Sequence, residues 1–313
     1  MSVYAMERVR QLLDYVLNRT AAPLIGQCHE IEDVERWFED EASLVQYRRG
    51  LAYMVFRQIV NNDQLAIDAE GNIKRAEWEA LEQRLQTMLA SGEVPQLDFP
   101  QGDSGVWGYI QSFLLEQYRY GDNVTVREGD VFLDCGAYCG DTAVWAIRQG
   151  AGRVYSFEPH PAHLDCLRRN DQKYGQGRIV TLPIGLGATE GSMNLEGYGP
   201  AARLVAEGQV QNQGQPPIQV PVVTLDNWCR NNAVKPDFIK MDLEGAEVDV
   251  LQGARGIITE YKPRLAICLY HRLSDMWVIP RMIKEMVPGY RFWCRQNSLI
   301  ADFVLYATIE AQA

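Results

Sequence analysis

The sequence has no CxxC pair, no Cys/His cluster with zinc-ligand spacing, and no apolar run that approaches 18 residues. The missing clusters argue against a structural zinc site or a thioredoxin-type motif. The short apolar runs predict no membrane span. Charged residues close to the first residue, such as Glu7 and Arg8, interrupt any signal-peptide core. We therefore expect a cytoplasmic protein.

Basic charge is also scarce, because 30 Lys and Arg residues face 41 Asp and Glu residues and leave a net charge of −11. Nucleic acids and anionic membranes both require local positive charge, so we expect neither as a partner. The balance favours a small, neutral or cationic substrate. The basic group near the C-terminus is expected on a solvated face, and it comprises Arg281, Lys284, Arg291 and Arg295.

The first 100 residues hold 17 acidic and 10 basic side chains, and their apolar residues recur with helical spacing. The predicted helices cover residues 9–17, 42–60 and 73–89. Turn-forming residues at 61–63 and 68–72 should separate them. We therefore predict an acidic N-terminal helical region over 1–102 and a second domain over 103–313. The N-terminal helices could also carry a homo-oligomer contact.

From residue 124 onward, short apolar β-rich runs alternate with helical stretches. The predicted strands are 131–134, 153–157, 178–184, 237–241 and 265–270, followed by an antiparallel hairpin of 290–294 and 303–307. This alternation predicts an α/β fold with a parallel, doubly wound sheet covered by helices on both faces. Residues 185–219, rich in Gly, Gln and Pro, are expected to form a flexible insertion that could act as a lid.

The most informative motif follows the first predicted strand, which ends in Asp134 and leads through Gly136 and Gly140 into a helix. The next strand ends in Glu158, and both acids should share the crevice at the carboxyl ends of the strands. Glu158 can accept both hydroxyls of a ribose. A pyrophosphate would meet Asp134 and the bulky Tyr138, whereas the sulfonium and ammonium of S-adenosylmethionine would be favoured there. The motif therefore predicts S-adenosylmethionine as the cofactor.

Two further strand ends supply the catalytic candidates. Asp242 should lie on the methyl-donor side of the crevice, and His271 follows the next strand with the pKa range of a general base. His271 is our first candidate for the base and Asp242 the second. Asp242 and Glu244 could instead hold a divalent metal, but no third ligand is evident, so we expect no metal site. Lys240 should be buried or paired with an acid. The other histidines, at 29, 160 and 163, have no comparable position.

Four blocks of sequence carry a resemblance: VFLDCGAYCGDTAVWAIRQGAGRVYSFEPHP, VPVVTLDNWC, DFIKMDLEGAEVDVLQGA and LAICLYH. In this order and spacing, over about residues 110–307, the chain resembles the FkbM family of methyltransferases. The resemblance implies the class I methyltransferase fold, a seven-stranded sheet with one antiparallel strand. It also implies O-methylation of a hydroxyl on a sugar or small molecule. We assign cofactor contacts to Asp134, Gly136, Ala137, Tyr138, Gly140, Glu158 and Asp242. Asp226 and Trp228 match a family position whose role the residues do not reveal.

Three alternatives stay open at this point. A nicotinamide-dependent oxidoreductase can share the sheet, although it should have a GxGxxG turn open to pyrophosphate. A nucleic-acid methyltransferase should carry a Pro-Pro-aromatic element where this chain has Asp242-Leu243-Glu244-Gly245. A non-catalytic interaction protein would use the fold as a scaffold and dock a partner on its acidic helices.

Overall fold

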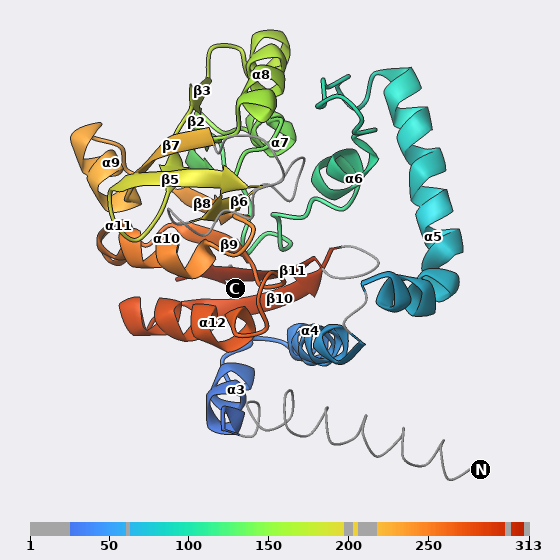
Figure 1. Cartoon of the computed structure of the whole chain (residues 1–313), viewed down its shortest axis with the longest axis vertical. Helices are drawn as coiled ribbons and strands as arrows, with labels where there is room; N and C mark the ends of the chain where they lie inside the picture. The colour runs from blue at the N-terminus through green and yellow to red at the C-terminus, as the bar shows by residue number, and fades with distance from the viewer. Residues whose placement is uncertain (1–25, 61–62, 197–202, 206–217, 298–301, 310–313) are drawn as a thin grey trace.

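A seven-stranded sheet forms the centre of the computed structural model, which describes residues 26–60, 63–196, 203–205, 218–297 and 302–309 (Figure 1). The strand order is β10-β11-β9-β8-β1-β2-β3, and β11 alone runs antiparallel to its neighbours. The strands are β1 Val131–Cys135, β2 Arg153–Phe157, β3 Ile179–Leu182, β8 Phe238–Met241, β9 Arg264–Cys268, β10 Arg291–Gln296 and β11 Phe303–Thr308. The predicted α/β fold class and the terminal hairpin are confirmed.

Helices cover both faces of this sheet (Figure 1). Those after the first strand are α7 Asp141–Arg148, α8 Pro161–Asn170 with the π-turn η3 Asp171–Gly175, α9 Leu225–Asn231, α10 Glu247–Gly253, α11 Arg255–Tyr261 and α12 Asp275–Met286. Successive strand residues face opposite sides. Phe132 therefore packs in one core with Trp145 of α7, whereas Leu133 packs in the other with Ile257 of α11. Burial on both faces explains the continuous apolar runs of the strands.

The N-terminal helices are α3 Cys28–Glu35, α4 Glu41–Val60 and α5 Asp63–Ser91, and the short α6 Val106–Tyr109 and π-turn η2 Ile110–Leu114 follow them. Among the N-terminal helices, α4 packs against the β10 edge of the sheet, α3 packs against α12, and α5 packs against α4 and η2. Val34 and Tyr47 share a core with Phe292 and Phe303 of the terminal hairpin. The predicted helix over 9–17 lies outside the described residues. The predicted domain division at residues 102/103 stays a prediction, and α3 and α4 bury apolar side chains in the core beyond it.

The predicted break at 68–72 is wrong, because α5 continues through it from Asp63 to Ser91. A glycine inside a helix, such as Gly71, costs about 1 kcal/mol relative to alanine. A helix of 29 residues accommodates one such position.

The segment predicted as a flexible insertion, 185–219, contains strands in the part that the structure describes, so that part is not an irregular loop. These strands are β4 Gly185–Leu186, β5 Gly191–Glu196, β6 Arg203–Val205 and β7 Ile218–Val223. They form a second sheet with the order β4-β7-β5-β6. Its Leu195 and Leu204 line the cavity described below. This segment is therefore part of the wall of the site.

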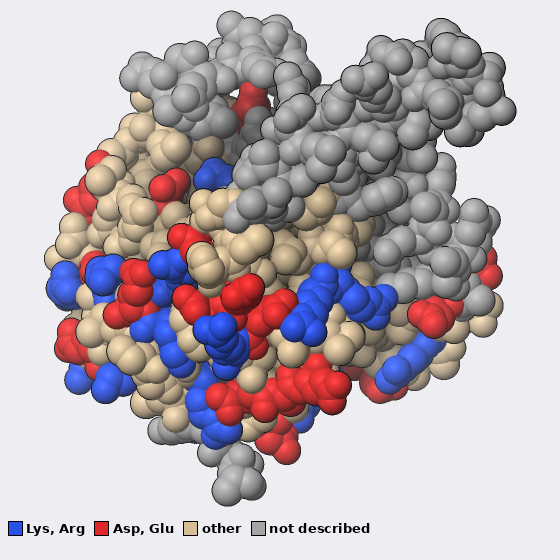
Figure 2. Space-filling view, turned by 90° about the horizontal axis from the view of Figure 1, so that it is seen from below, with Lys and Arg blue, Asp and Glu red and all other residues tan. Residues whose placement is uncertain are grey.

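The basic group near the C-terminus is engaged within the chain. Arg281 pairs with Glu30 at 2.7 Å, and Arg291 pairs with Glu39 at 2.6 Å. Lys284 donates to the carbonyl of Tyr290 at 2.7 Å. On the face shown in Figure 2, basic and acidic side chains lie side by side rather than in separate areas. Of the four residues in this basic group, Arg291 is exposed, whereas Arg281, Lys284 and Arg295 are half-buried, so the predicted solvated face is found only in part.

None of the seven cysteines, all of which lie in the described part of the chain, forms a disulfide, and six of them are buried. Among the helices that the structure describes, none combines the length and the apolar character needed to cross a bilayer.

Candidate functional site

A cavity of about 450 Å³ lies at the carboxyl ends of β1, β2 and β8, where the sequence predicts the crevice. The loops that follow these strands form one part of its wall, and Leu195 and Leu204 of the second sheet form another. Residues 103–118, which we call the cap segment, and Asp302 complete the wall. The site therefore combines strand ends with a segment that precedes the first strand.

The loop after β1 touches the loop after β8. Gly136 has φ of +83°, and a Cβ at this position would lie 1.9 Å from the backbone oxygen of Asp242. Only glycine satisfies both conditions. Gly136, Ala137 and Tyr138 line the cavity, as predicted for cofactor contacts, whereas Gly140 packs against Leu167 behind the wall.

Asp134 lies behind the cavity wall, so our expectation that it faces the ligand needs correction. Its side chain is fully buried, and its Oδ1 lies 3.1 Å from Nζ of Lys240. Lys240 also donates to the carbonyl of Gly136. Burial alone would lower the pKa of Lys240, but Asp134 and Asp242 outweigh burial and raise it. Asp134 therefore neutralises a buried lysine that ties β1 to β8, as predicted for Lys240.

Glu158 lines the cavity with a carboxylate that the backbone orients. Its Oε2 accepts the amide of Tyr138 at 2.9 Å, and its Oε1 accepts the amide of His160 at 2.8 Å. Nδ1 of His163 lies 3.2 Å from the same Oε1. A carboxylate offers about four acceptor positions, so this one retains capacity for a diol. His163 also lines the cavity, and no motif in the sequence had singled it out.

Asp242 lines the cavity between two tyrosine hydroxyls. Tyr118 of the cap segment donates to its Oδ2 and Tyr270 to its Oδ1, both at 2.9 Å. Burial alone would raise the pKa of Asp242, but His271, Lys240 and the two hydroxyls lower it. The carboxylate therefore stays ionised at neutral pH.

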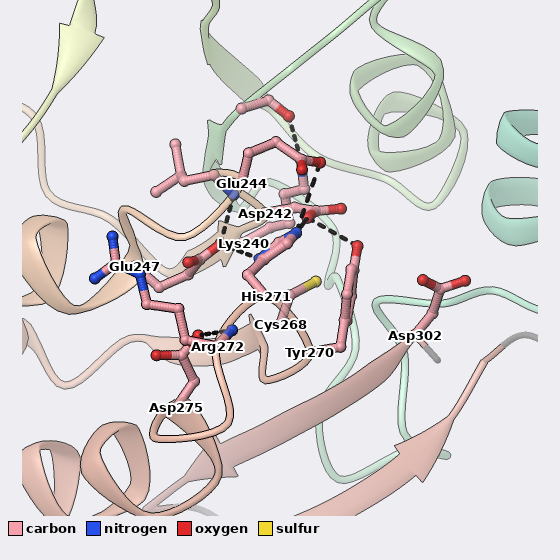
Figure 3. Close-up of polar contacts among 12 residues, drawn as sticks. Lys240, Asp242, Glu244, Glu247, Cys268, Tyr270, His271, Arg272, Asp275 and Asp302 are labelled. Carbon is pink, nitrogen blue, oxygen red and sulfur yellow. Dashed lines mark hydrogen bonds and ion pairs between the residues drawn. The ribbon is translucent and has the colours of Figure 1, made fainter. Parts of the chain in front are cut away.

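His271 lies behind Asp242 and is not among the residues that line the cavity (Figure 3). Its Nδ1 is 2.8 Å from Glu247, and its Nε2 is 3.4 Å from Asp242 and 3.6 Å from Glu244. Burial alone would lower the pKa of His271, but the three carboxylates outweigh burial and hold it well above its ordinary value. An imidazole that keeps its proton at neutral pH is a poor general base, so the structure argues against our first candidate.

His271 lies beside both Asp242 and Glu244 in the structure. One atom each from Asp242, Glu244 and His271 lie within 4.8 Å of one another, which is a geometry able to hold a metal ion. Glu244 adopts φ of +52°, a left-handed conformation that is rare and strained outside glycine.

Several cavity residues escaped the sequence analysis. Tyr118 comes from a segment with no recognisable motif, and Tyr270 precedes the histidine that drew attention. Asp141 lies at the start of α7 and accepts the hydroxyl of Ser112 at 2.5 Å. Of these three residues, only Tyr270 could have been selected from the sequence, because it lies next to His271 at the end of a predicted strand.

Asp226 and Trp228 have structural roles. The Asp226 carboxylate accepts the amides of Gly256 and Ile257, both at 2.8 Å, and so caps the start of α11. The Trp228 ring packs edge-on against Phe157, with centroids 4.9 Å apart. Neither residue lines the cavity.

The wall of the cavity is acidic. Its carboxyl groups are those of Asp103, Asp141, Glu158, Asp242, Glu244 and Asp302, while its lysine, Lys240, is already paired. A ligand that carries positive charge is therefore favoured. The prediction of a cationic ligand rested on Asp134 and Glu158, and of these two only Glu158 lines the cavity.

Three comparisons place the chain among known proteins. The family described as "Methyltransferase FkbM domain" matches residues 134–293. The hexuronic acid methyltransferase AglP of Haloferax volcanii is 28% identical over 128 residues, which are 41% of this chain and 51% of that protein. The structure of methyltransferase FkbM from Methylobacillus flagellatus KT matches with a TM-score of 0.58 and 20% identity, covering 94% of this chain and 62% of that chain.

The matches cover different parts of the chain and of the relatives. The chain spans about half the length of the curated relative, and the solved structure supports the fold. The cap segment lies outside the residues that the family matches.

Proposed function

Since the chain belongs to the FkbM methyltransferase family, we propose that it transfers the methyl group of S-adenosylmethionine to a hydroxyl of a sugar or a related small molecule. The family membership favours a methyltransferase over the oxidoreductase and scaffold alternatives. Cofactor, acceptor atom and acceptor class are proposals that rest on the cavity.

The observation that supports S-adenosylmethionine as the cofactor is the position of the Glu158 carboxylate beside the glycine loop. The amides of Tyr138 and His160 fix this carboxylate at the cavity wall, where it can accept the two hydroxyls of a ribose. Gly136 leaves room where a Cβ would collide with the loop after β8. The apolar side chains of Phe157 and Leu186 on the same wall suit an adenine ring.

Asp242 is the residue that we place next to the acceptor hydroxyl. Bound S-adenosylmethionine would supply an activated methyl group on a positively charged sulfur. Alignment of the acceptor then contributes much of the rate enhancement, and Asp242 receives the hydroxyl proton. His271 lies behind Asp242 and acts as a positioning residue rather than as the base.

The acceptor wall suits a sugar. Trp107 of the cap segment is 44% exposed, lines the cavity, and packs against Trp78 with ring centroids 4.2 Å apart. An exposed aromatic face can cover the apolar face of a pyranose ring. Gln111 and Asp302, joined by a 2.6 Å hydrogen bond, offer polar groups to its hydroxyls. The relative AglP, by its name, methylates a hexuronic acid, which favours the same class.

Cofactor binding can be tested through Glu158. S-Adenosylhomocysteine should raise the melting temperature of the wild type, whereas NADH should not. The shift should disappear in Glu158→Ala and persist in Glu260→Ala, which removes an exposed carboxylate on α11. Stabilisation by NADH alone would reject the proposed function.

The acceptor can be tested with methyl-labelled cofactor against a panel of neutral sugars, hexuronic acids and amines. Label should enter a hydroxyl oxygen of a sugar, as located by NMR of the product. Asp242→Asn should retain the thermal shift with S-adenosylhomocysteine and lose turnover by about 10²–10⁴-fold. Transfer to an amine would reject O-methylation.

A further inference from the structure

Asp242, Glu244 and His271 converge on one point at the edge of the cavity. The two carboxylates line the cavity, and the imidazole approaches them from behind (Figure 3). They come from two loops, the one after β8 and the one after β9. One atom from each residue lies within 4.8 Å of the others. Two ligands of one divalent cation, each about 2.1 Å from it, lie roughly 3–4 Å apart. Nε2 of His271 lies at such distances, 3.4 Å from Asp242 and 3.6 Å from Glu244.

The imidazole faces the two carboxylates without bonding either of them. Nε2 of His271 is 3.4 Å from Oδ1 of Asp242 and 3.6 Å from Oε1 of Glu244, and it makes no hydrogen bond. Charge-assisted hydrogen bonds between such groups measure about 2.7–2.9 Å. A buried nitrogen aimed between two carboxylates at longer distances is the arrangement expected of a ligand set.

Glu247 holds the other side of the ring. Its fully buried carboxylate has Oε1 2.8 Å from Nδ1 of His271, and the same atom accepts the amide of Leu243 at 2.7 Å. Histidine ligands of metals commonly give their second nitrogen to a carboxylate, which fixes the tautomer and the ring. When a cation binds, the proton of Nε2 is released. The lone pair of Nε2 then faces Asp242 and Glu244, while Nδ1 stays 2.8 Å from Oε1 of Glu247.

We propose that Asp242, Glu244 and His271 bind a divalent cation, with Glu247 as the residue that orients the histidine. One imidazole nitrogen with two carboxylates suits an ion such as Mn²⁺. Because the carboxylates line the cavity, the cation would bind oxygens of the acceptor, a role that rests on the proposed function. A hydroxyl bound to such a cation loses its proton more readily. The cation also offsets the negative charge of the acceptor wall.

The competing explanation is that a protonated His271 alone neutralises the three carboxylates. The two explanations predict different results for Mn²⁺ binding, even when no substrate is present. A cation site binds Mn²⁺ through nitrogen and oxygen, whereas an imidazolium excludes the ion from the cluster.

The test is an electron paramagnetic resonance titration of the chelator-treated full chain with Mn²⁺ alone. We expect one bound Mn²⁺ per chain and hyperfine coupling to an imidazole nitrogen. His271→Ala should abolish the nitrogen coupling, and Glu244→Gln should weaken binding at least about tenfold. Glu247→Gln should lower the affinity by about 10–100-fold while it keeps the coupling. Asp302→Asn, which changes another carboxylate of the cavity, should bind as the wild type does.

Two results would overturn the site: no stoichiometric Mn²⁺ binding to the wild type, or bound Mn²⁺ without nitrogen coupling. Binding of S-adenosylhomocysteine to the same chelator-treated protein separates this inference from the proposed function. If S-adenosylhomocysteine binds and Mn²⁺ does not, the cation site is rejected and the proposed function is not. If the nucleoside does not bind, the proposed function fails, and the Mn²⁺ titration still decides the site.

Discussion

The two sides of the cavity are built differently. The cofactor side, around β1 and β2, relies on backbone amides and a glycine turn within residues 136–160, which hold Glu158. The acceptor side relies on side chains from separate segments. Tyr118 and Tyr270 hold Asp242 although they lie 124 and 28 residues away from it in the chain.

This difference determines what each side tolerates. A backbone cradle depends on conformation, so a single methyl group in the wrong place disrupts it. A side-chain network depends on partners, so each substitution removes one of several contacts. The pair Asp134–Lys240 connects the two sides, because one member lies on β1 and the other on β8.

The largest effect is expected from Lys240→Met, which leaves Asp134 buried without its partner. Breaking a buried ion pair in this way costs about 3–5 kcal/mol of unfolding free energy. Both sides of the cavity should lose binding together. Urea denaturation measures the cost. As a control, Lys173→Met breaks an exposed pair with Asp98 and should cost less than about 1 kcal/mol. Equal losses in the two variants would contradict the connecting role of Lys240.

Gly136→Ala should damage the cofactor side first. The variant combines a left-handed backbone with a Cβ that would lie 1.9 Å from the oxygen of Asp242, so we expect a loss of roughly 3 kcal/mol and of cofactor binding. Calorimetric titration with S-adenosylhomocysteine checks this. Gly121→Ala shares the left-handed backbone but meets nothing within 4 Å, so it should cost about 1 kcal/mol and leave binding intact.

Asp275→Asn should change how stability depends on pH. Burial, followed by the nearby Glu247, raises the pKa of Asp275 to about 7, from an ordinary 3.8. The unfolded chain therefore releases this proton first, and wild-type stability falls as pH rises from about 4 to 7. The variant avoids this loss and should exceed the wild type by on the order of 1–3 kcal/mol at pH 8. Urea denaturation at pH 5 and pH 8 measures the difference, and an identical pH dependence in both proteins would refute the assignment.

Tyr118→Phe should have the smallest effect and act on the acceptor side alone. Asp242 loses one of its two tyrosine partners, at a cost of about 1 kcal/mol, while cofactor affinity stays unchanged and turnover falls. Tyr120→Phe is the matched control, because it removes a 2.8 Å bond to Asp40 away from the cavity. A drop in cofactor affinity in Tyr118→Phe would break the separation between the two sides.

Local patterns in the sequence were sufficient for the main sheet and for the position of Glu158. Apolar runs at strand spacing located the strands, and Glu158 follows from its place at a strand end. The second sheet was missed because its strands lie among glycines and prolines. The helix through Gly71 was missed because one unfavourable residue does not end a long helix.

The acceptor side was harder to predict because its chemistry depends on distant partners. His271 was placed correctly beside Asp242, yet its protonation depends on Glu247, whose carboxylate the sequence did not connect to the ring. On the cofactor side, Asp134 was given the wrong task for the same reason, because its pairing with Lys240 is a contact between neighbouring strands. Tyr118 had no local pattern at all.

The cap segment has a consequence for how such an enzyme can change over evolutionary time. It forms part of the acceptor wall, yet it lies before Asp134, where the family match begins. Substitutions at cap positions such as Trp107 and Gln111 can therefore reshape the space that we propose for the acceptor, while Gly136 and Glu158 stay the same. A chain built in this way can acquire a new acceptor without having to reinvent its cofactor chemistry.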